Sequence, residues 1–370
     1  MMHPLLGRSG PAPAKLCARF LCVGLLTTSC SASSCQSQYG AVSAAPASMA
    51  ARPHSPTLDD YFGWHGRLVF SDDGSNAVET SFDQHPGFVV ADEGQSMVRV
   101  YSDDARLLWS VGGSGPGAKE FQRLQTALRN SHGDIIALDF MGKLAVFDSL
   151  GNLKRTLQTH LTPAYNAILL DDSTLLIGGR REGDNETALV HVFDLRTDSI
   201  THSFFKTPPH PQEFDYAYRF SGWASTVKLG GDTVAVTFAL TDSLYLFRTN
   251  GERLAALPLG LDHFRVLQEP RPRDRSPEAE IAWRNSYTRL SGVFRAPDHS
   301  IYIQYGNLHV RQPVWGLARF ELDAHQLVKQ FEVPEALLLL GISPRTGNLY
   351  FLRDETMENT VWSIGKLLPR

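Results

Sequence analysis

The 370-residue chain has no cysteine after residue 35. Its four cysteines all lie in the N-terminal segment, at Cys17, Cys22, Cys30 and Cys35. This absence excludes a disulfide framework, a cysteine-ligated zinc site and a cysteine nucleophile from the rest of the chain.

The sequence also lacks a large excess of charge. It contains 35 lysines and arginines against 39 aspartates and glutamates, which gives a formal net charge of -4. A nucleic-acid-binding protein usually carries a strong basic excess, so we expect no nucleic-acid partner. After residue 30 there is also no run of 18 apolar residues, the length that predicts a membrane-spanning helix.

Residues 1–30 resemble a bacterial lipoprotein export signal. The basic residues of the first part are Arg8, Lys15 and Arg19. They precede the apolar stretch Phe20–Leu26 and the sequence TTSC, in which Cys30 would become the lipidated first residue. Cleavage near AVSAA without lipid is the alternative. We therefore expect export to the periplasm or the outer membrane surface, with membrane contact only through a lipid anchor.

The following segment, residues 31–57, is rich in Ser, Ala and Pro. Such a composition buries too little apolar surface to fold, which predicts a disordered tether. The remainder, residues 58–370, is expected to form a single domain and to be a monomer.

A repeated unit runs through this domain. Each copy has an alternating apolar segment that ends in an aromatic residue, then a polar turn and a second short strand, as in LAVFDSLGNLKRTLQ (Leu144–Gln158). The marker aromatics are Tyr101, Phe147, Phe193, Phe247, Phe320 and Trp362. Subtraction of their residue numbers gives intervals of 46, 46, 54, 73 and 42 residues. A period of about 40–50 residues with several strands in each unit indicates a β-propeller.

The expected fold is therefore all-β, with six blades of four antiparallel strands A to D. The sixth copy ends after strand C, and an N-terminal strand over Gly66–Asp72 is expected to complete it and close the ring. Seven blades, with one hidden in residues 260–290, are the alternative. Ser276–Pro277, with Glu278 and Glu280, predicts a short helical insertion over residues 277–288.

Units such as DIIALDFMGKLAVFDSLGNLKRTL, and the linker GSGPGAKEF, resemble the NHL-repeat and TolB-like six-bladed propellers of exported bacterial proteins. The resemblance implies the fold over residues 60–368 and leaves the function open, since such propellers include binders, lyases and hydrolases.

The segment GGSGPGAKEFQRL (Gly112–Leu124) also approaches the spacing of a phosphate-binding loop. However, Lys119 comes one position late, and the loop is expected to join two strands rather than a strand and a helix. We therefore interpret it as a sharp link between blades, in which Phe121 packs between neighbours.

Loop lengths predict which face of the propeller carries function. The turns from A to B and from C to D lie on one face and are short, whereas the B-to-C turns and D-to-A links lie on the other face and include the long segments. Two long links are rich in aromatic residues and arginines, which suit binding of peptides, glycans or anions. The predicted ligand-binding residues are Tyr216, Tyr218, Arg219, Trp223, Trp283, Arg284, Tyr287 and Arg289. Packing of these side chains onto the disc is the alternative.

A central-channel metal is a second possibility that the resemblance implies, with ligands at the starts of A strands. The candidate ligands are Asp83, His85, Asn130 and Asn166. No close metal-binding motif occurs among the 13 histidines, and we expect no cofactor, with Ca²⁺ or Zn²⁺ as the alternative.

The sequence therefore predicts an exported cell-envelope binding module that contacts a protein, peptide or glycan through its long-loop face. The alternative is a channel-metal-dependent hydrolase or lyase acting on lactones, esters or polysaccharides. Convergence of carboxylate, Asn or His side chains at the channel mouth would favour the enzyme.

Overall fold

The strands of the repeated units assemble into six separate sheets. The computed structural model describes residues 59, 61–70, 77–181, 188–307, 314–333, 338–355 and 360–367. Within these ranges every sheet is antiparallel and has four strands. The expected signal (1–30) and tether (31–57), with Cys30, lie outside the described residues.

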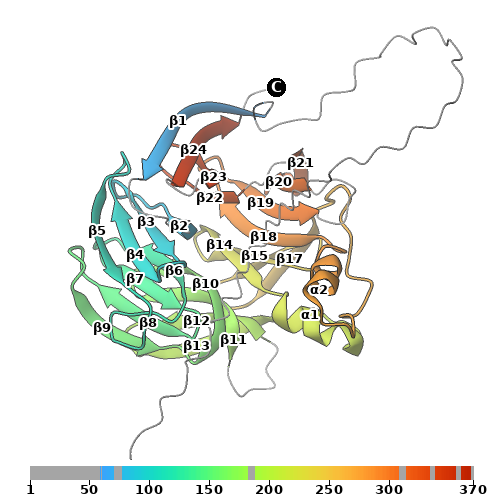
Figure 1. The fold of residues 1–370 in the computed structure, drawn as a ribbon, viewed down its shortest axis with the longest axis horizontal. Coiled ribbons are helices and arrows are strands. Elements are labelled where there is room, and N and C mark those ends of the chain that lie inside the picture. The colour runs from blue at the N-terminus through green and yellow to red at the C-terminus, as the bar shows by residue number, and fades with distance from the viewer. Residues whose placement is uncertain are drawn as a thin grey trace, which may run out of the picture. The chain divides into compact units, whose positions relative to one another are not determined.

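Each sheet is one blade, numbered here along the chain (Figure 1). Blade 1 contains β2 (Ala77–Ser81), β3 (Phe88–Asp92), β4 (Met97–Tyr101) and β5 (Leu107–Gly112). Blade 2 contains β6 (Leu124–Arg129), β7 (Ile135–Asp139), β8 (Lys143–Phe147) and β9 (Leu153–Gln158). Blade 3 contains β10 (Leu161–Asp171), β11 (Thr174–Arg181), β12 (Ala188–Asp194) and β13 (Ser199–Lys206).

The other three blades follow the same order. Blade 4 contains β14 (Ala224–Gly230), β15 (Thr233–Phe238), β16 (Ser243–Arg248) and β17 (Arg253–Pro258). Blade 5 contains β18 (Arg289–Arg295), β19 (Ser300–Asn307), β20 (Val314–Glu321) and β21 (Gln326–Val333). Blade 6 contains β22 (Leu338–Ile342), β23 (Leu349–Glu355), β24 (Thr360–Leu367) and β1 (Phe62–Phe70).

The six inner strands form a closed ring. Strand β2 contacts β6, and contacts continue through β10, β14, β18 and β22 back to β2. Figure 1 shows these strands around the centre, with β5, β9 and β13 outermost in their blades. The predicted six-bladed propeller is confirmed. The seven-blade alternative is wrong, because residues 259–288 form a link with one helix between β17 and β18.

The burial of each strand matches its position in the blade. Strands β3, β7 and β12 are buried along their whole length, because a neighbouring blade covers each face. The outer strands β5, β9 and β17 keep exposed positions. Five marker aromatics are buried near the ends of the third strands, and Trp362 lies in β24.

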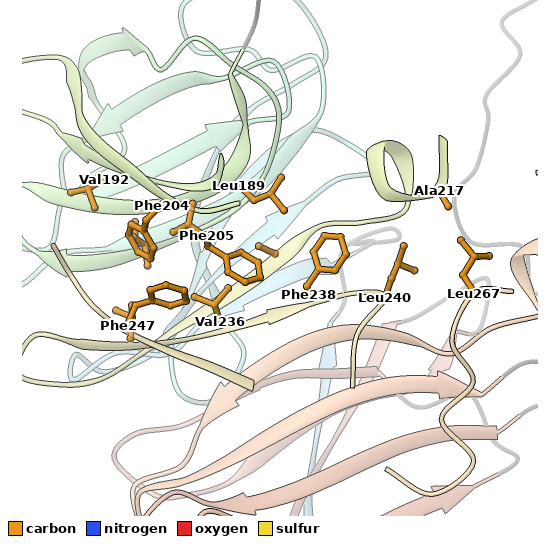
Figure 2. Close-up of a cluster of buried hydrophobic side chains, with 14 of the residues drawn as sticks. Leu189, Val192, Phe204, Phe205, Ala217, Val236, Phe238, Leu240, Phe247 and Leu267 are labelled. Atoms are coloured by element: carbon orange, nitrogen blue, oxygen red, sulfur yellow. The ribbon is translucent and has the colours of Figure 1, made fainter. Parts of the chain in front are cut away.

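Hydrophobic side chains fill the spaces between blades. In the described part of the chain, the buried ones form six clusters, one at each blade interface. Figure 2 shows the cluster between blades 3 and 4, where Phe204 and Phe205 meet Phe247 and Val236. Blade-to-blade packing is therefore the main apolar burial of the domain.

The N-terminal strand completes the last blade, as the sequence predicts. Strand β1 pairs with β24 from Phe62 opposite Leu367 to Phe70 opposite Thr360. It begins four positions before the expected Gly66, because Phe62 is buried against blade 5 as well as blade 6. The predicted Ser71 and Asp72 lie outside the described residues.

The glycine-rich link joins β5 to β6, two strands, which rules out a phosphate-binding loop. Gly112 and Gly113 have φ angles of +127° and +133°, a region that side chains disfavour. The Phe121 N–H donates to the Gly113 carbonyl over 2.8 Å, and the Lys143 Nζ donates to the Gly117 carbonyl over 2.6 Å. Phe121 is fully buried between blades 1 and 2, so its predicted role is confirmed.

Two short α-helices lie in the long links. The predicted insertion forms α2 (Pro277–Arg284), whose N-cap Ser276 accepts a hydrogen bond from the Ala279 N–H over 3.3 Å. It ends before the expected residue 288, because Thr288 donates to the Arg265 carbonyl as the chain enters β18. The second helix, α1 (Asp215–Phe220), follows the 3₁₀ turn η2 (Gln212–Phe214) and was not predicted. Neither described helix is long and apolar enough to span a membrane.

We predict that Phe121→Ala destabilises the domain, because it empties a site shared by two blades. The expected loss in the free energy of unfolding is about 3–5 kcal/mol in chemical denaturation. The control Leu150→Ala removes a side chain that is 76% exposed and should cost less than about 0.5 kcal/mol. Equal losses for the two variants would contradict the packing role of Phe121.

We predict that His191 makes stability pH-dependent. Burial lowers the pKa of this wholly enclosed histidine from 6.5 to about 4. Above pH 6.5 both folded and unfolded forms are neutral. Between pH 6.5 and 4 only the unfolded chain gains the proton, so stability falls, by about 3 kcal/mol in total. Unfolding free energies of wild type and His191→Gln, measured by urea titration at several pH values, should fall more steeply with decreasing pH in the wild type over this range. An equal dependence on pH in the two proteins would contradict the prediction.

Candidate functional site

The long links lie on one face of the propeller, opposite the short turns. Three D-to-A links, residues 113–123, 207–223 and 259–288, leave the outer strand of one blade and enter the inner strand of the next. The link between blades 2 and 3 has only two residues, 159 and 160. We call the surface formed by residues 207–223 and 259–288 the long-link face. The predicted B-to-C insertions are Arg181–Thr187, Tyr305–Gly316 and Arg353–Asn359. Their described residues belong to strands β11, β19, β20 and β23, and residues 182–187, 308–313 and 356–359 lie outside the described residues.

The two long links pack against each other through aromatic side chains. The rings of Tyr216 in α1 and Trp283 in α2 lie 6.1 Å apart, and the Arg271 guanidinium lies 3.7 Å from the centre of the Tyr216 ring. The Trp283 indole N–H donates to the Glu269 carbonyl over 2.9 Å. Figure 1 shows α1 and α2 side by side at the edge of the ring. Tertiary contact of this kind explains why the six-residue α1 is helical despite its length.

The structure divides the predicted ligand-binding aromatics by burial. Trp283 and Tyr287 are buried, at 5% and 0% exposure, and belong to the cluster between blades 3 and 4. Tyr216 and Tyr218 are half-buried, and the Tyr218 ring stacks on His210 at 3.9 Å. Trp223 is half-buried just before β14. The buried pair therefore holds the links onto the disc, and ligand contact by the other three stays a prediction.

The predicted arginines occupy two parts of this face. Arg219 is exposed on α1, with its guanidinium 5.9 Å from the centre of the Phe220 ring. Arg284 ends α2 and lies 3.7 Å from Glu280, and Arg289 begins the inner strand β18. Burial lowers the pKa of Arg289, and the neighbouring charge of Arg284 adds to that effect. Like charges thus gather where the second link meets the ring.

Sequence reasoning missed one arginine of this face. Arg180, near the end of β11, donates from Nη2 to the carbonyl oxygens of Tyr218 and Gly222 over 2.6 and 3.3 Å. Burial lowers its pKa, with a further contribution from Arg219, whereas neighbouring Tyr165 opposes the shift. The only sequence signal is the position of Arg180 at the end of a predicted second strand, which places it on the long-link face.

The candidate metal ligands do not lie at the starts of inner strands, which corrects their predicted position. Asp83 and His85 follow β2, Asn130 follows β6, and Asn166 lies within β10. The first three therefore belong to A-to-B turns, on the face opposite the long links. Strand β2 has no distinctive sequence pattern, so its end could not be placed.

These four side chains bond to protein groups. Asp83 pairs with Arg129 over 2.7 Å, and His85 lies 3.1 Å from Asp83. Asn130 accepts from the Asp134 N–H over 2.9 Å and so stabilises its own turn, and Asn166 donates to the Ala224 carbonyl over 2.7 Å, linking two inner strands. Among the residues that the structure describes, no three His, Cys, Asp or Glu side chains are grouped so as to hold a metal ion.

A hollow of about 350 Å³ opens on the short-turn face between blades 3 and 4. Its polar groups already have protein partners: the Lys228 ammonium donates to the Leu170 carbonyl, and His202 Nε2 lies 2.7 Å from the Thr249 carbonyl. This hollow therefore offers few free polar groups to a ligand.

Comparisons with known proteins support the fold. No family model matches the chain, and no curated protein matches it. A member of the DUF4221 family from Bacteroides vulgatus is similar at a TM-score of 0.57 and 11% identity, over 84% of this chain and 98% of that one. A candidate exported protein from Bacteroides fragilis is similar at 0.59 and 11%, over 86% and 98%. Hydrazine synthase from Kuenenia stuttgartiensis reaches 0.50 and 10%, over 77% and 75%. At these identities the similarity shows the fold alone.

We predict that Trp283→Ala loosens the second link. The variant loses the ring contacts to Tyr216 and Tyr287 and the hydrogen bond to Glu269, at an expected cost of about 3–5 kcal/mol in unfolding free energy. Hydrogen–deuterium exchange of residues 259–289 should accelerate. Ile281→Ala, which removes a side chain 44% exposed on the same helix, is the control and should leave exchange unchanged. Unaltered exchange in Trp283→Ala would contradict the packing role.

Proposed function

We propose that the protein is an exported binding module that contacts a cell-envelope protein, peptide or glycan through its long-link face. One observation carries the proposal. Large hydrophobic side chains stay exposed on this face, namely Phe220 at 58%, Val266 at 53% and Ile281 at 44%. Exposed apolar groups next to arginines are typical of protein interaction sites.

Export is part of the proposal. The similar protein from Bacteroides fragilis is named a candidate exported protein, which agrees with the signal-like residues 1–30 of this chain. We propose location in the periplasm or at the outer membrane surface, with Cys30 as the lipid attachment point. Membership of the NHL-repeat or TolB-like type stays a prediction.

The expected monomeric state and the absence of a cofactor also remain predictions. The alternative function, a hydrolase or lyase with Ca²⁺ or Zn²⁺ in the channel, has no specific observation in its favour. A convergent set of ligands is what that function requires.

The binding face can be tested by site-specific photocrosslinking in the native cell envelope. A benzophenone amino acid at position 220 replaces an exposed aromatic on α1, and we predict discrete adducts there. The control position is 150, where Leu150 is 76% exposed in a short turn of the opposite face. Adducts from 150 alone, or identical adducts from both positions, would overturn the proposal.

A further inference from the structure

Among the described residues, three arginines at or beside the long-link face lack a carboxylate of the kind that neutralises other arginines of the domain. Arg99 lies 3.1 Å from Asp92, and Arg129 lies 2.7 Å from Asp83. By contrast, the described residues provide no ion pair for Arg180, Arg219 or Arg289. Together with Arg284 these three form what we call the arginine cluster.

The cluster meets at the turn that follows α1. Arg180 approaches from blade 3 and donates to the Tyr218 and Gly222 carbonyls, with a third contact of 3.5 Å to the Thr207 hydroxyl. Its Nε is buried and has no hydrogen-bond acceptor within the described part of the chain. The guanidinium is therefore fixed in place but incompletely compensated, which carries an electrostatic cost.

The same turn is approached from the second link and from the start of blade 5. The buried Tyr287 side chain lies beside Ser221, the C-cap residue of α1, and is close enough to Arg284, Arg289 and Glu280 for their charges to act on it. Arg289 lies at the entrance to inner strand β18. Side chains from blades 3 and 5 thus flank one short segment, and they bring positive charge to it from both sides.

The nearest carboxylate of the second link cannot neutralise this charge, because it is already shared. Glu280 pairs with Arg271, lies 3.5 Å from Arg275 and lies 3.7 Å from Arg284. Three guanidiniums thus compete for one carboxylate. An incoming oxyanion would relieve the repulsion, and the planar guanidinium suits a carboxylate in bidentate geometry.

Exposed apolar side chains lie near arginines of the two links in the sequence, and they indicate which class of molecule bears that carboxylate. Phe220 adjoins Arg219 in α1, and Ile281 lies about one turn before Arg284 in α2. Val266 follows Arg265, whose carbonyl accepts from the Thr288 N–H at the entry to β18. We call these three hydrophobic residues the apolar rim. An acidic polysaccharide has no apolar side chains to cover such a rim, whereas a peptide does.

We propose that the arginine cluster and apolar rim bind an acidic peptide segment of a partner protein. Its carboxylates pair with Arg219, Arg284 and Arg289, its apolar side chains cover the rim, and Arg180 adds positive potential from beneath. This inference rests on the proposed function and names the ligand class for the same face.

The test is binding of the purified full chain to an array of 12-residue peptides that combine Leu or Phe with Asp and Glu. The comparison set has the same sequences with Asn and Gln in place of the acids. We expect about tenfold stronger binding to the acidic set, reduced as salt rises because ion pairs are screened. Equal binding to both sets would overturn the inference.

Matched variants place the binding on this face. Arg219→Gln changes an exposed side chain and should weaken binding to the acidic peptides about fivefold or more. Arg196→Gln is the control, since Arg196 is 71% exposed in its side chain on the short-turn face. An unchanged affinity in Arg219→Gln, or an equal loss in the control, would overturn the inference.

Polygalacturonate and sodium sulfate are tested beside the peptides. Binding of either one in place of the acidic peptides would assign the cluster to a glycan or a small anion, and would overturn the peptide assignment. The photocrosslinking result separates the two proposals. Adducts at position 220 with no preference for acidic peptides would reject this inference alone, whereas no adducts there would reject the binding face itself.

Discussion

The pairing of the first strand with the last is the interaction on which the rest of the domain depends. Strand β1 supplies the outer strand of blade 6, next to the three C-terminal strands β22, β23 and β24. It also adds Phe62, whose ring centre lies 5.4 Å from Phe331 in blade 5 and 5.1 Å from Phe351 in blade 6. Strand pairing and apolar packing thus join the two ends of the ring, so that each blade packs against a neighbouring blade on both of its faces.

Closure of the ring fixes the relative positions of the inner strands, and through them the long-link face. Arg180 and Arg289 belong to blades 3 and 5, whose inner strands both contact the inner strand of blade 4. Only a rigid ring can hold such residues around one turn. The scaffold therefore provides position, and the two long links provide the chemistry, as is usual for propellers with variable loops.

The sequence predicts the repeating part of this protein better than its candidate site. Marker aromatics such as Phe147 recur because five of the blades bury one near the end of the third strand. The single glycine-rich link between β5 and β6 is recognisable because its sharp turn requires positive φ angles at Gly112 and Gly113. The helix α1 escapes prediction because contact with Trp283 stabilises it, rather than its own propensity. The convergence of Arg180 with Arg289 depends on blade order in space, which no local pattern contains. Asp83 was misplaced because the end of β2 gives no signal.

Hydrogen–deuterium exchange of the intact protein tests the closed ring most directly. If β1 closes the ring, its bonded amides should exchange slowly and by the same cooperative opening as those of β24 and β22. The variant Phe62→Ala weakens the packing of β1. Amide exchange should then accelerate in β1 and also in the strands at the interface of blades 5 and 6. Exchange of β1 amides about a hundredfold or more faster than those of β24, with the other strands still protected, would contradict the account.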